Sequence, residues 1–466
     1  MAEVVGRTQG PAAAAAAPGR EFEESEQTGA TMADMHAGFE AMSKYPLFEA
    51  LHKRRSRRIS LGIQSVPAGS NTYTSNAKPQ PLSELEEAVL ISAIGLTGVT
   101  LPDRPFADPT GAKILGTPNL NFPGRAAGST DNCQATHFFL FNDSGAYLLR
   151  RLDGVDPTEP VTPEVLIRRA AQSKVRILDK RPDFPREFPY YLDSNRFLSN
   201  VPGSTVLFPV VDMTRQYINA LMYLLTEPAG HRPALLDDRN FYLPAGVGKW
   251  IRSGFLNKDI KLPLGVLGTM RTQIEAELLL QNLILMLQAM GLGGWIHSAA
   301  GTTALLPALG FSYVTPPYRG LDFFRWGTFV REARKQPIGL PPYIECICPP
   351  YYQTMADAVQ AVIDSKYKAG GTYGDDAYFR QIFQGNRGET YLREVPHYTD
   401  DVVACTKDIC TYIYERHGRF PAHCDAVYVP GVWLQAHHLD LNYYDTLFKG
   451  GYTETQRDHQ QRWHGQ

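Results

Sequence analysis

The sequence of 466 residues predicts an α+β fold in which a mainly antiparallel sheet is flanked by helices. Two apolar segments, 137–141 and 147–149, are separated by the turn formers of NDSGA, a pattern typical of a β-hairpin. Residues 274–290 form a long segment that is apolar almost all round, which predicts a helix covered on every side at the centre of a domain or a dimer. No internal repeat interrupts this mixture of helix and strand signals.

The first elements follow a low-complexity start. Residues 1–43 contain PAAAAAAPG and little that can be buried, so they are expected to form a disordered tail. A short helix with Pro46 in its first turn then precedes a basic run. The segment 81–98 predicts a second helix, because Ser83 and Glu86 have the spacing of a capping box.

The later elements divide the chain into a domain over 44–368 and a C-terminal extension over 369–466 that packs on it. Residues near 225–265 are rich in Pro, Gly and aromatic residues and predict an irregular insertion. Pro209 is expected to place its strand at an edge or a bulge. The remaining elements are helices over 163–172, 215–225, 354–366 and 399–414 and strands over 205–211 and 343–348.

Composition excludes several classes of partner. The 46 basic residues against 48 acidic ones give no general attraction to nucleic acid or to an anionic membrane. The most apolar segment, 278–292, has fifteen residues, fewer than the roughly 20 that cross a bilayer. The six cysteines include no CxxC pair, and we expect reduced, mostly buried thiols in a cytoplasmic protein.

The run KRRSRRIS at 53–60 concentrates positive charge in a nearly neutral chain. A nucleic-acid patch needs further basic residues nearby, and a twin-arginine export signal needs an apolar stretch directly afterwards; the sequence supplies neither. The remaining interpretation is a phosphate clamp, in which guanidinium groups bind the oxygens of a cofactor.

Two further groups carry chemistry. Asn132 and Gln134 lie between a small-residue loop and an apolar strand, where their amides either contact a planar polar ligand or only shape a turn. The third group, QNLILMLQAMGLGGWIHS over 281–298, is a buried helix that ends at Gly291 and Gly293, and a glycine C-cap explains Gly291 without a ligand.

In this order the three groups resemble the nitroreductase-like flavoprotein family, with some likeness to its heterocycle-oxidising dehydrogenase branch. The likeness covers roughly residues 45–365. Ala135 and Thr136 depart from the proline and aromatic residue usual after the loop glutamine. The matching residues are Arg54, Arg55, Ser56 and Arg58 in the first group; Ser129, Thr130, Asn132 and Gln134 in the second; and Gln281, Asn282, Gly291, Leu292, Gly293, Trp295 and Ile296 in the third.

The resemblance implies an FMN site at the interface of a homodimer. It assigns Arg54, Arg55 and Ser56 to the phosphate and ribityl chain and Arg58 to the flavin N1 and C2 oxygen, and it leaves Arg57 as the variable position. The other implied cofactor contacts are Ser129, Thr130, Asn132, Gln134, Trp295, Ile296, His297 and Ser298. The family's late phosphate-binding residue has only positional candidates, which are Arg331, Arg334 and Lys335.

The implied activity is an FMN-dependent oxidoreductase that transfers hydride from NADPH or NADH via the flavin to an electron-poor small molecule such as a nitroaromatic, quinone or enone. No catalytic side chain is expected, because the cofactor carries the chemistry. The alternatives are a dehydrogenase that passes substrate electrons to oxygen and a non-catalytic flavin- or partner-binding protein. His437, His438 and Asp440 are expected to bind no metal, because adjacent side chains point apart and no spaced partner is evident.

Overall fold

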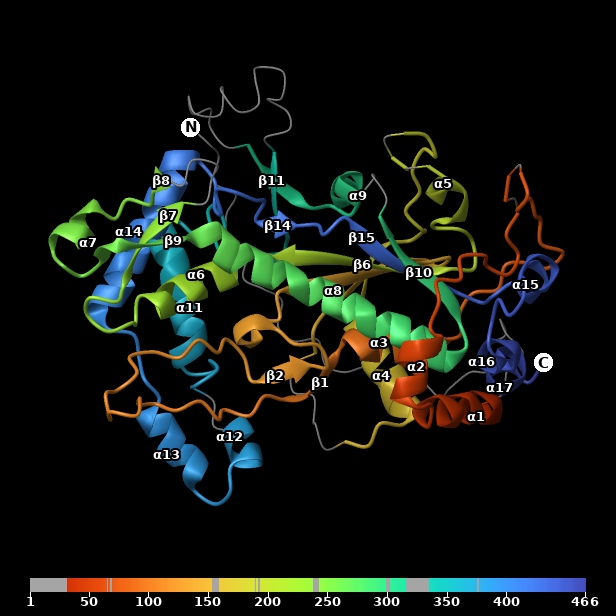
Figure 1. The fold of residues 1–466 in the computed structure, drawn as a ribbon, viewed down its shortest axis with the longest axis horizontal. Helices are drawn as coiled ribbons and strands as arrows, with labels where there is room; N and C mark the ends of the chain where they lie inside the picture. The colour runs from red at the N-terminus through yellow and green to blue at the C-terminus, as the bar shows by residue number, and fades with distance from the viewer. Residues whose placement is uncertain are drawn as a thin grey trace.

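A central antiparallel sheet organises the protein (Figure 1). The computed structural model describes residues 32–64, 66–67, 69–152, 159–188, 190–191, 193–237, 243–298, 302–315, 335–374 and 377–466. Its strands follow the order β10 (Gly293–Ser298), β15 (Val432–His437), β6 (Thr205–Asp212), β3 (Thr136–Asn142), β4 (Gly145–Leu149) and β5 (Lys174–Leu178), and β14 (Val427–Tyr428) also pairs with β6. Every pairing in this sheet is antiparallel, which confirms the predicted α+β class and the hairpin.

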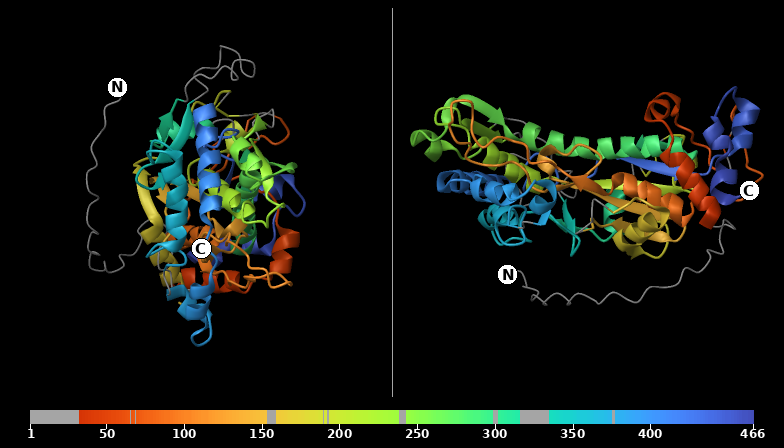
Figure 2. Two further views of the ribbon diagram at one scale, coloured as in Figure 1. Left: turned by 90° about the vertical axis from the view of Figure 1, so that its left-hand side faces the viewer. Right: turned by 90° about the horizontal axis from the view of Figure 1, so that it is seen from below.

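The long helix α8 (Leu264–Met290) runs along one side of the sheet, as both views show (Figures 1 and 2). Phe138 and Leu140 on β3 pack into one apolar cluster with α8, α3 (Glu84–Ile94) and α4 (Pro163–Ser173). Phe139 and Phe141 point the other way, into a second cluster with α6 (Thr214–Leu224) and α9 (Thr302–Ala308). The alternation along β3 therefore buries both faces of the sheet.

The prediction of a disordered tail over 1–43 is wrong for its last twelve residues. Residues Met32–Ser43 form α1, which lies against α17 (His459–His464) beside the C-terminus (Figure 1). Met35, Phe39 and Met42 recur at helical spacing and join the cluster that contains Trp463. A buried partner from the other end of the chain thus orders this segment, while residues 1–31 lie outside the described part.

The expectation that Pro209 places its strand at an edge or a bulge is wrong, and the register of β6 with β3 runs through Pro209 without a shift. β6 lies inside the sheet, between β3 and β15. β15 pairs with β6 only at Thr205–Leu207 and β14 only at Val211–Asp212, so Pro209 falls in the gap between these two partners. Proline has no backbone N–H to donate, and on the side of β6 that faces β14 and β15 no described strand pairing needs one at this position.

The C-terminal segment also differs from its prediction as an extension packed on a finished domain. β15 occupies an interior place in the sheet and pairs with β10 over its full length. All residues from Trp433 to His437 are buried. The core of the fold is therefore incomplete without residues 427–437.

The region near 225–265 is more regular than expected, since it forms a small sheet of β7 (Pro233–Asp237), β8 (Leu243–Pro244) and β9 (Asn257–Pro263). The capping box of Ser83 and Glu86 is confirmed. The predicted strand at 343–348 shortens to β13 (Ile344–Glu345). The other elements are α2 (Leu47–Lys53), β1 (Leu96–Val99), β2 (Pro123–Arg125), the 3₁₀ turn Thr130–Asn132, α5 (Asn195–Leu198), α7 (Gly248–Arg252), β11 (Ser312–Val314), β12 (Gln336–Leu340), α11 (Met355–Tyr367), α12 (Ala377–Ile382), α13 (Arg387–Glu394), α14 (Asp400–His417), α15 (Leu441–Leu447) and α16 (Glu454–Arg457).

Two global features complete the fold. Among the described residues, no helix has both the length and the apolar composition that a membrane crossing requires. All six cysteines are free thiols, and five of them are buried.

Candidate functional site

A cleft of about 860 Å³ lies where the basic run, the loop before α5 and the segment after α15 meet. Its volume falls within the range of about 300–1,000 Å³ typical of cofactor and ligand sites. Five cationic side chains line it against the single carboxylate of Asp193, so the cleft favours an anionic ligand. These cations are Arg55, Arg57, Arg58, Arg196 and Lys449.

The fold brings the basic run to the strand that follows α8. The backbone N–H of Arg57 donates to the carbonyl of Gly294 at 3.1 Å, which fixes the run against β10. The Arg58 guanidinium lies 5.3 Å from the centroid of the Trp295 ring, within cation–π range. The first sequence group therefore lies directly beside the third, although no residue of 281–298 lines the cleft.

Only some of the predicted phosphate-clamp residues line the cleft. Arg55, Ser56 and Arg58 line the cleft, whereas Arg54 follows α2 and is absent from the lining. Arg57, expected at the variable position, is instead 4% exposed. Its side chain donates to the carbonyl of Gly451 at 2.9 Å and to Oε1 of Gln288 at 3.2 Å, so it is a structural residue.

The β10 residues present two different faces. Trp295 and His297 are buried, with ring centroids 3.8 Å apart, whereas Ile296 is half-buried and Ser298 is exposed. His297 Nε2 lies 2.8 Å from the Ser199 hydroxyl, and burial lowers the pKa of His297 to about 3. The buried indole N–H of Trp295 has no hydrogen-bond partner among the described residues.

The loop over 129–134 uses its amides internally. The Asn132 side chain donates to the carbonyls of Asn121, Phe122 and Pro123 at 2.7, 3.1 and 3.2 Å. Gln134 donates to Oδ1 of Asn132 at 2.6 Å, and both side chains are buried. This geometry accounts for Asn132 through the turn-shaping alternative, and the half-buried Ser129 and Thr130 are its more accessible residues.

A buried glutamate that the sequence analysis missed holds this loop. Glu275, on α8, accepts hydrogen bonds from the Ser129 hydroxyl and from the backbone N–H of Thr136, the latter at 2.8 Å. Arg125 lies 3.3 Å from the same carboxylate, and burial lowers the pKa of Arg125 to about 10. The available sequence signal was weak, because Glu275 is one of three charged residues in the largely apolar α8, with Arg271 and Glu277.

One chain does not bring all three sequence groups together. Ser129 bonds α8 at Glu275 and Arg57 bonds it at Gln288, which places the two attachments about 20 Å apart along the helix at 1.5 Å per residue. No residue of the loop over 129–134 lines the cleft. Of the positional candidates for late phosphate binding, Lys335 is exposed before β12, and Arg331 and Arg334 lie outside the described residues.

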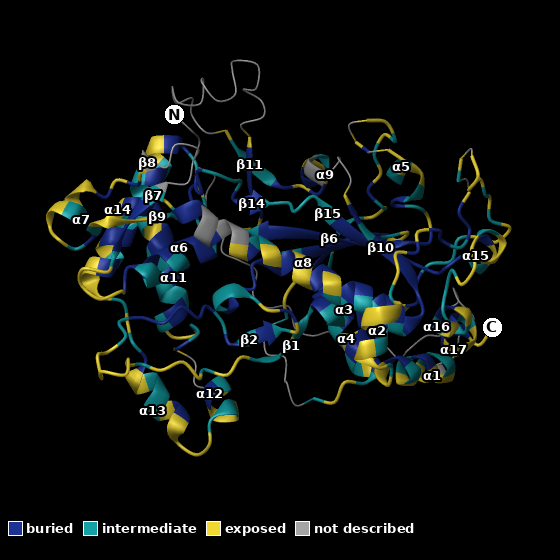
Figure 3. Cartoon of the chain, in the orientation of Figure 1, coloured by how far each residue is buried: buried dark blue, intermediate teal, exposed yellow. Residues whose placement is uncertain are grey.

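An exposed apolar face on α2 and α8 lies between the cleft and the loop over 129–134. Ile274 and Leu278 on α8 are 45% and 42% exposed. Leu47, Phe48 and Leu51 on the neighbouring α2 are 66%, 74% and 51% exposed (Figure 3). The expectation that α8 is covered on every side does not hold within one chain.

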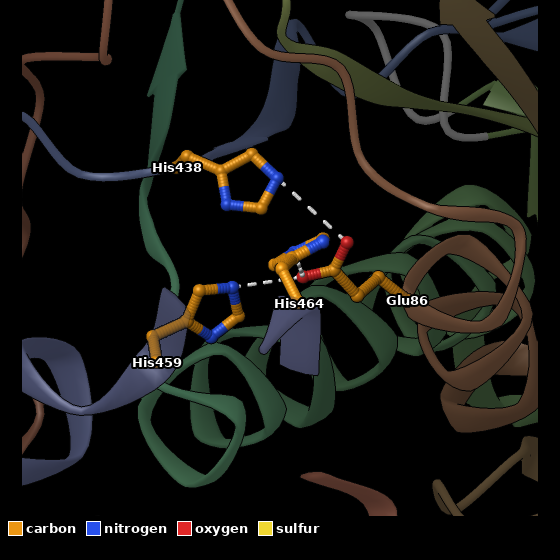
Figure 4. Close-up of side chains that lie close together, drawn as sticks. All are labelled: Glu86, His438, His459 and His464. Atoms are coloured by element: carbon orange, nitrogen blue, oxygen red, sulfur yellow. Dashed lines mark hydrogen bonds and ion pairs between the residues drawn. The ribbon is translucent and has the colours of Figure 1, made fainter. Parts of the chain in front are cut away.

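A second cluster escaped the sequence analysis altogether. His438, His459 and His464 surround the carboxylate of Glu86, and all four residues are buried (Figure 4). The argument that His438 lacks partners for a metal is therefore wrong, although the absence of a metal stays untested. His459 and His464 form an H-x4-H pair, a spacing typical of zinc ligands, which was the available sequence signal. Glu86 is 352 positions before His438, so only the fold joins all four residues.

Comparisons with known proteins assign no family. No family description matches the sequence, and no curated protein matches it. One solved structure that it resembles is a protein from Ralstonia eutropha JMP134 with the provisional description of nitroreductase, at 14% identity and a TM-score of 0.26 over 55% of this chain and 70% of that one. This identity and TM-score are too low to support an argument about function, so the fold and the cleft define only an α+β protein with a cationic site.

Proposed function

We propose that the cleft binds FMN and that the protein is an FMN-dependent oxidoreductase. The observation that carries the proposal is the convergence of Arg55, Ser56 and Arg58 on one cleft beside Trp295. Guanidinium forks and a hydroxyl match the oxygens of a phosphate. The buried N–H of Trp295, behind Arg58, has no hydrogen-bond partner among the described residues.

In this proposal Arg55 and Ser56 hold the phosphate and ribityl chain, and Arg58 faces the flavin ring. The bound FMN would accept hydride from NADPH or NADH and pass it to an electron-poor small molecule. The stacked rings of Trp295 and His297 are buried behind Arg58 and support its position at the cleft. His297 is neutral in this environment and keeps its hydrogen bond to Ser199, so it positions the wall and transfers no proton.

The site would be completed by a second copy of the chain. The exposed face of α2 and α8 separates the cleft from the loop over 129–134. Pairing two such faces about a two-fold axis would bury this apolar surface and bring the loop of one copy toward the cleft of the other. Homodimerisation is therefore part of the proposal.

The absorbance spectrum of the purified chain and titration with FMN test the binding step. Arg55→Ala should weaken FMN binding by roughly 1.5–3 kcal/mol, the value of a charge-assisted hydrogen bond. Arg393→Ala, an exposed arginine on α13, is the matched control and should leave affinity unchanged. A colourless protein that takes up no FMN would overturn the proposal.

Stopped-flow absorbance then separates the candidate activities. Rapid bleaching of the flavin band by NADPH or NADH supports the reductase. Bleaching only by an organic substrate, followed by oxygen consumption, indicates the dehydrogenase that passes electrons to oxygen. Stable FMN binding without bleaching by any donor leaves the non-catalytic binding protein.

A further inference from the structure

The carboxylate of Glu86 lies at the centre of three imidazoles (Figure 4). His459 Nε2 and His464 Nε2 are 2.8 and 3.3 Å from Glu86 Oε1, and His438 Nε2 is 3.7 Å from Oε2. One ligand atom from each residue falls within 4.8 Å of all the others. The four side chains therefore present three nitrogens and an oxygen to one small volume.

The hydrogen bond at Nδ1 of His459 determines whether the Nε2 atom that faces the Glu86 carboxylate carries a proton. Its Nδ1 lies 2.8 Å from the carbonyl of Met290, which only accepts, so Nδ1 carries the proton and donates. In a neutral ring Nε2 then carries a lone pair, which would point at a carboxylate oxygen 2.8 Å away. Two such lone pairs repel each other, so a neutral His459 needs a cation between the two atoms.

The charge of the cluster is compatible with the same cation. Glu86 is fully buried, and its ion-pair partners among the described residues are only the three histidines. A buried carboxylate without a compensating positive charge is strongly unfavourable. A divalent cation supplies that charge while the imidazoles stay in the neutral form that binds metals.

We propose that Glu86, His438, His459 and His464 bind one divalent transition-metal ion, and that the ion is Zn²⁺. Tetrahedral zinc with bonds of about 2.0–2.1 Å has ligand atoms about 3.3 Å apart. His459 and His464 lie 2.8 and 3.3 Å from Glu86 Oε1, near that value, while His438 lies 3.7 Å from Oε2 and would move slightly to join them. Imidazole nitrogen favours zinc over magnesium or calcium, which take oxygen ligands.

The site is structural. Four protein ligands complete a tetrahedral shell and leave no position for substrate. The ligands come from the first turn of α3, from the residue after β15 and from both ends of α17. One ion therefore ties the C-terminal helix to the start of the domain, and this inference stands independently of FMN binding.

The surroundings contain an outer shell. The Gln460 amide nitrogen lies 3.1 Å from Nδ1 of His438, the nitrogen that faces away from Glu86, and the Pro81 carbonyl lies 3.3 Å from Nε2. Zinc binding through Nε2 would move the ring proton from Nε2 to Nδ1, which would then donate to the amide oxygen of a turned Gln460. Such a contact orients the ligating ring, and its loss typically lowers metal affinity about 10- to 100-fold. Gln460 gives the site a graded test that keeps all four ligands.

Metal analysis of the full-length purified chain, followed by calorimetric titration of the chelator-treated protein with Zn²⁺, tests the proposal. We expect one zinc per chain. His459→Asn should lower Zn²⁺ affinity more than about 100-fold, and Gln460→Ala should lower it about 10- to 100-fold. His36→Asn is the control, because His36 forms an exposed pair with Glu164 at 2.7 Å outside the cluster and should not change the affinity.

A second measurement covers variants that fail to fold. Loading the wild-type chain with Co²⁺ should give the strong visible absorption of tetrahedral cobalt, and Zn²⁺ should displace it. Absence of bound metal, together with no visible cobalt band and no thermal stabilisation by Zn²⁺ beyond that by Mg²⁺, would overturn the proposal and leave an ion-pair cluster. Equal Zn²⁺ affinity in wild type, His459→Asn and Gln460→Ala would also overturn it. Flavin absorbance is read separately, so failure of FMN binding leaves these outcomes unchanged.

Discussion

The Nε–H of Arg57 donates to the backbone carbonyl of Gly451 at 2.9 Å and so joins the basic run to the segment that follows α15. The two residues are 394 positions apart, and both border the cleft. The second contact of this guanidinium, to Gln288, reaches the last turn of α8. One buried arginine thus joins two walls of the cleft, the basic run and the segment after α15, to the end of α8.

Arg57→Ala should lower the free energy of unfolding by roughly 1.5–3 kcal/mol, because it removes charge-assisted hydrogen bonds from buried partners. Urea titration followed by fluorescence measures the change. Arg55→Ala is the control: the Arg55 side chain is exposed and bonds only to the carbonyls of His52 and Arg54. Its change in stability should stay within about 0.5 kcal/mol. Similar stability losses in both variants would contradict the structural role of Arg57.

Arg58 should affect the cofactor differently from Arg55. Its guanidinium lies over Trp295 and faces the cleft, so in the proposed site it stabilises the negative charge that the flavin gains on reduction. Arg58→Ala should retain part of the FMN yet show a lower midpoint potential and slower reduction by NADPH. Spectroelectrochemical titration of wild type, Arg55→Ala and Arg58→Ala measures both properties. An unchanged potential in Arg58→Ala would remove Arg58 from the flavin ring.

His297 should make stability depend on pH. Burial lowers the pKa of His297 to about 3 in the folded protein, whereas an unfolded histidine titrates near about 6.5. Below pH 6.5 the unfolded chain therefore binds a proton that the folded chain does not, and this contribution to stability is lost as pH falls, at about 1.4 kcal/mol per pH unit. Between pH 4 and 6, His297→Asn should reduce the slope of unfolding free energy against pH by about this amount. An unchanged slope would show that His297 protonates in the folded state.

Asn132 now has a different expected phenotype from the one its sequence context suggested. Its amide already serves three backbone carbonyls, so Asn132→Ala should lower the free energy of unfolding by about 1–3 kcal/mol. Thermal unfolding without FMN measures this effect, and Cys133→Ala, next to it in the same loop, is the control for packing. If Asn132→Ala keeps full stability and loses FMN, the side chain contacts the cofactor directly.

Local signals in the sequence were sufficient to predict elements whose stabilising contacts lie within a few residues of one another. Ser83 and Glu86 satisfy each other within three residues, and the turn formers after Phe141 set the hairpin, so both features were predictable. Pro209 was misplaced because its tolerance depends on where β14 and β15 end, and these strands lie more than 200 residues later. α1 was missed for a similar reason, since its apolar face is buried by elements far along the chain, chiefly the C-terminal helix α17 and also α8 and α4.

The difference between local and long-range contacts also explains why the cationic cleft could be anticipated from the sequence and the histidine cluster could not. Charge density pointed to the basic run, because it is continuous in sequence, and the family resemblance selected Arg54, Arg55, Ser56 and Arg58 within it. Three of these four line the cleft, and their role in cofactor binding stays a prediction. The histidine cluster could not be found this way, since its ligands combine the first turn of α3 with the last 30 residues of the chain. A capping glutamate gives no sign that its side chain also meets three imidazoles.

The exposed face of α2 and α8 should make the protein a dimer in solution. Apolar side chains that are 42–74% exposed on two packed helices favour association with a second copy, because pairing removes them from water. Light scattering should therefore give about twice the chain mass of 51.9 kDa. Leu278→Arg puts a charge into this face and should shift the protein to monomer, with loss of FMN if the cleft needs the second copy. Val161→Arg changes a residue that is 61% exposed and lies before α4, outside this face, and should leave the dimer intact. A wild-type protein that stays monomeric at micromolar concentration would refute the dimer.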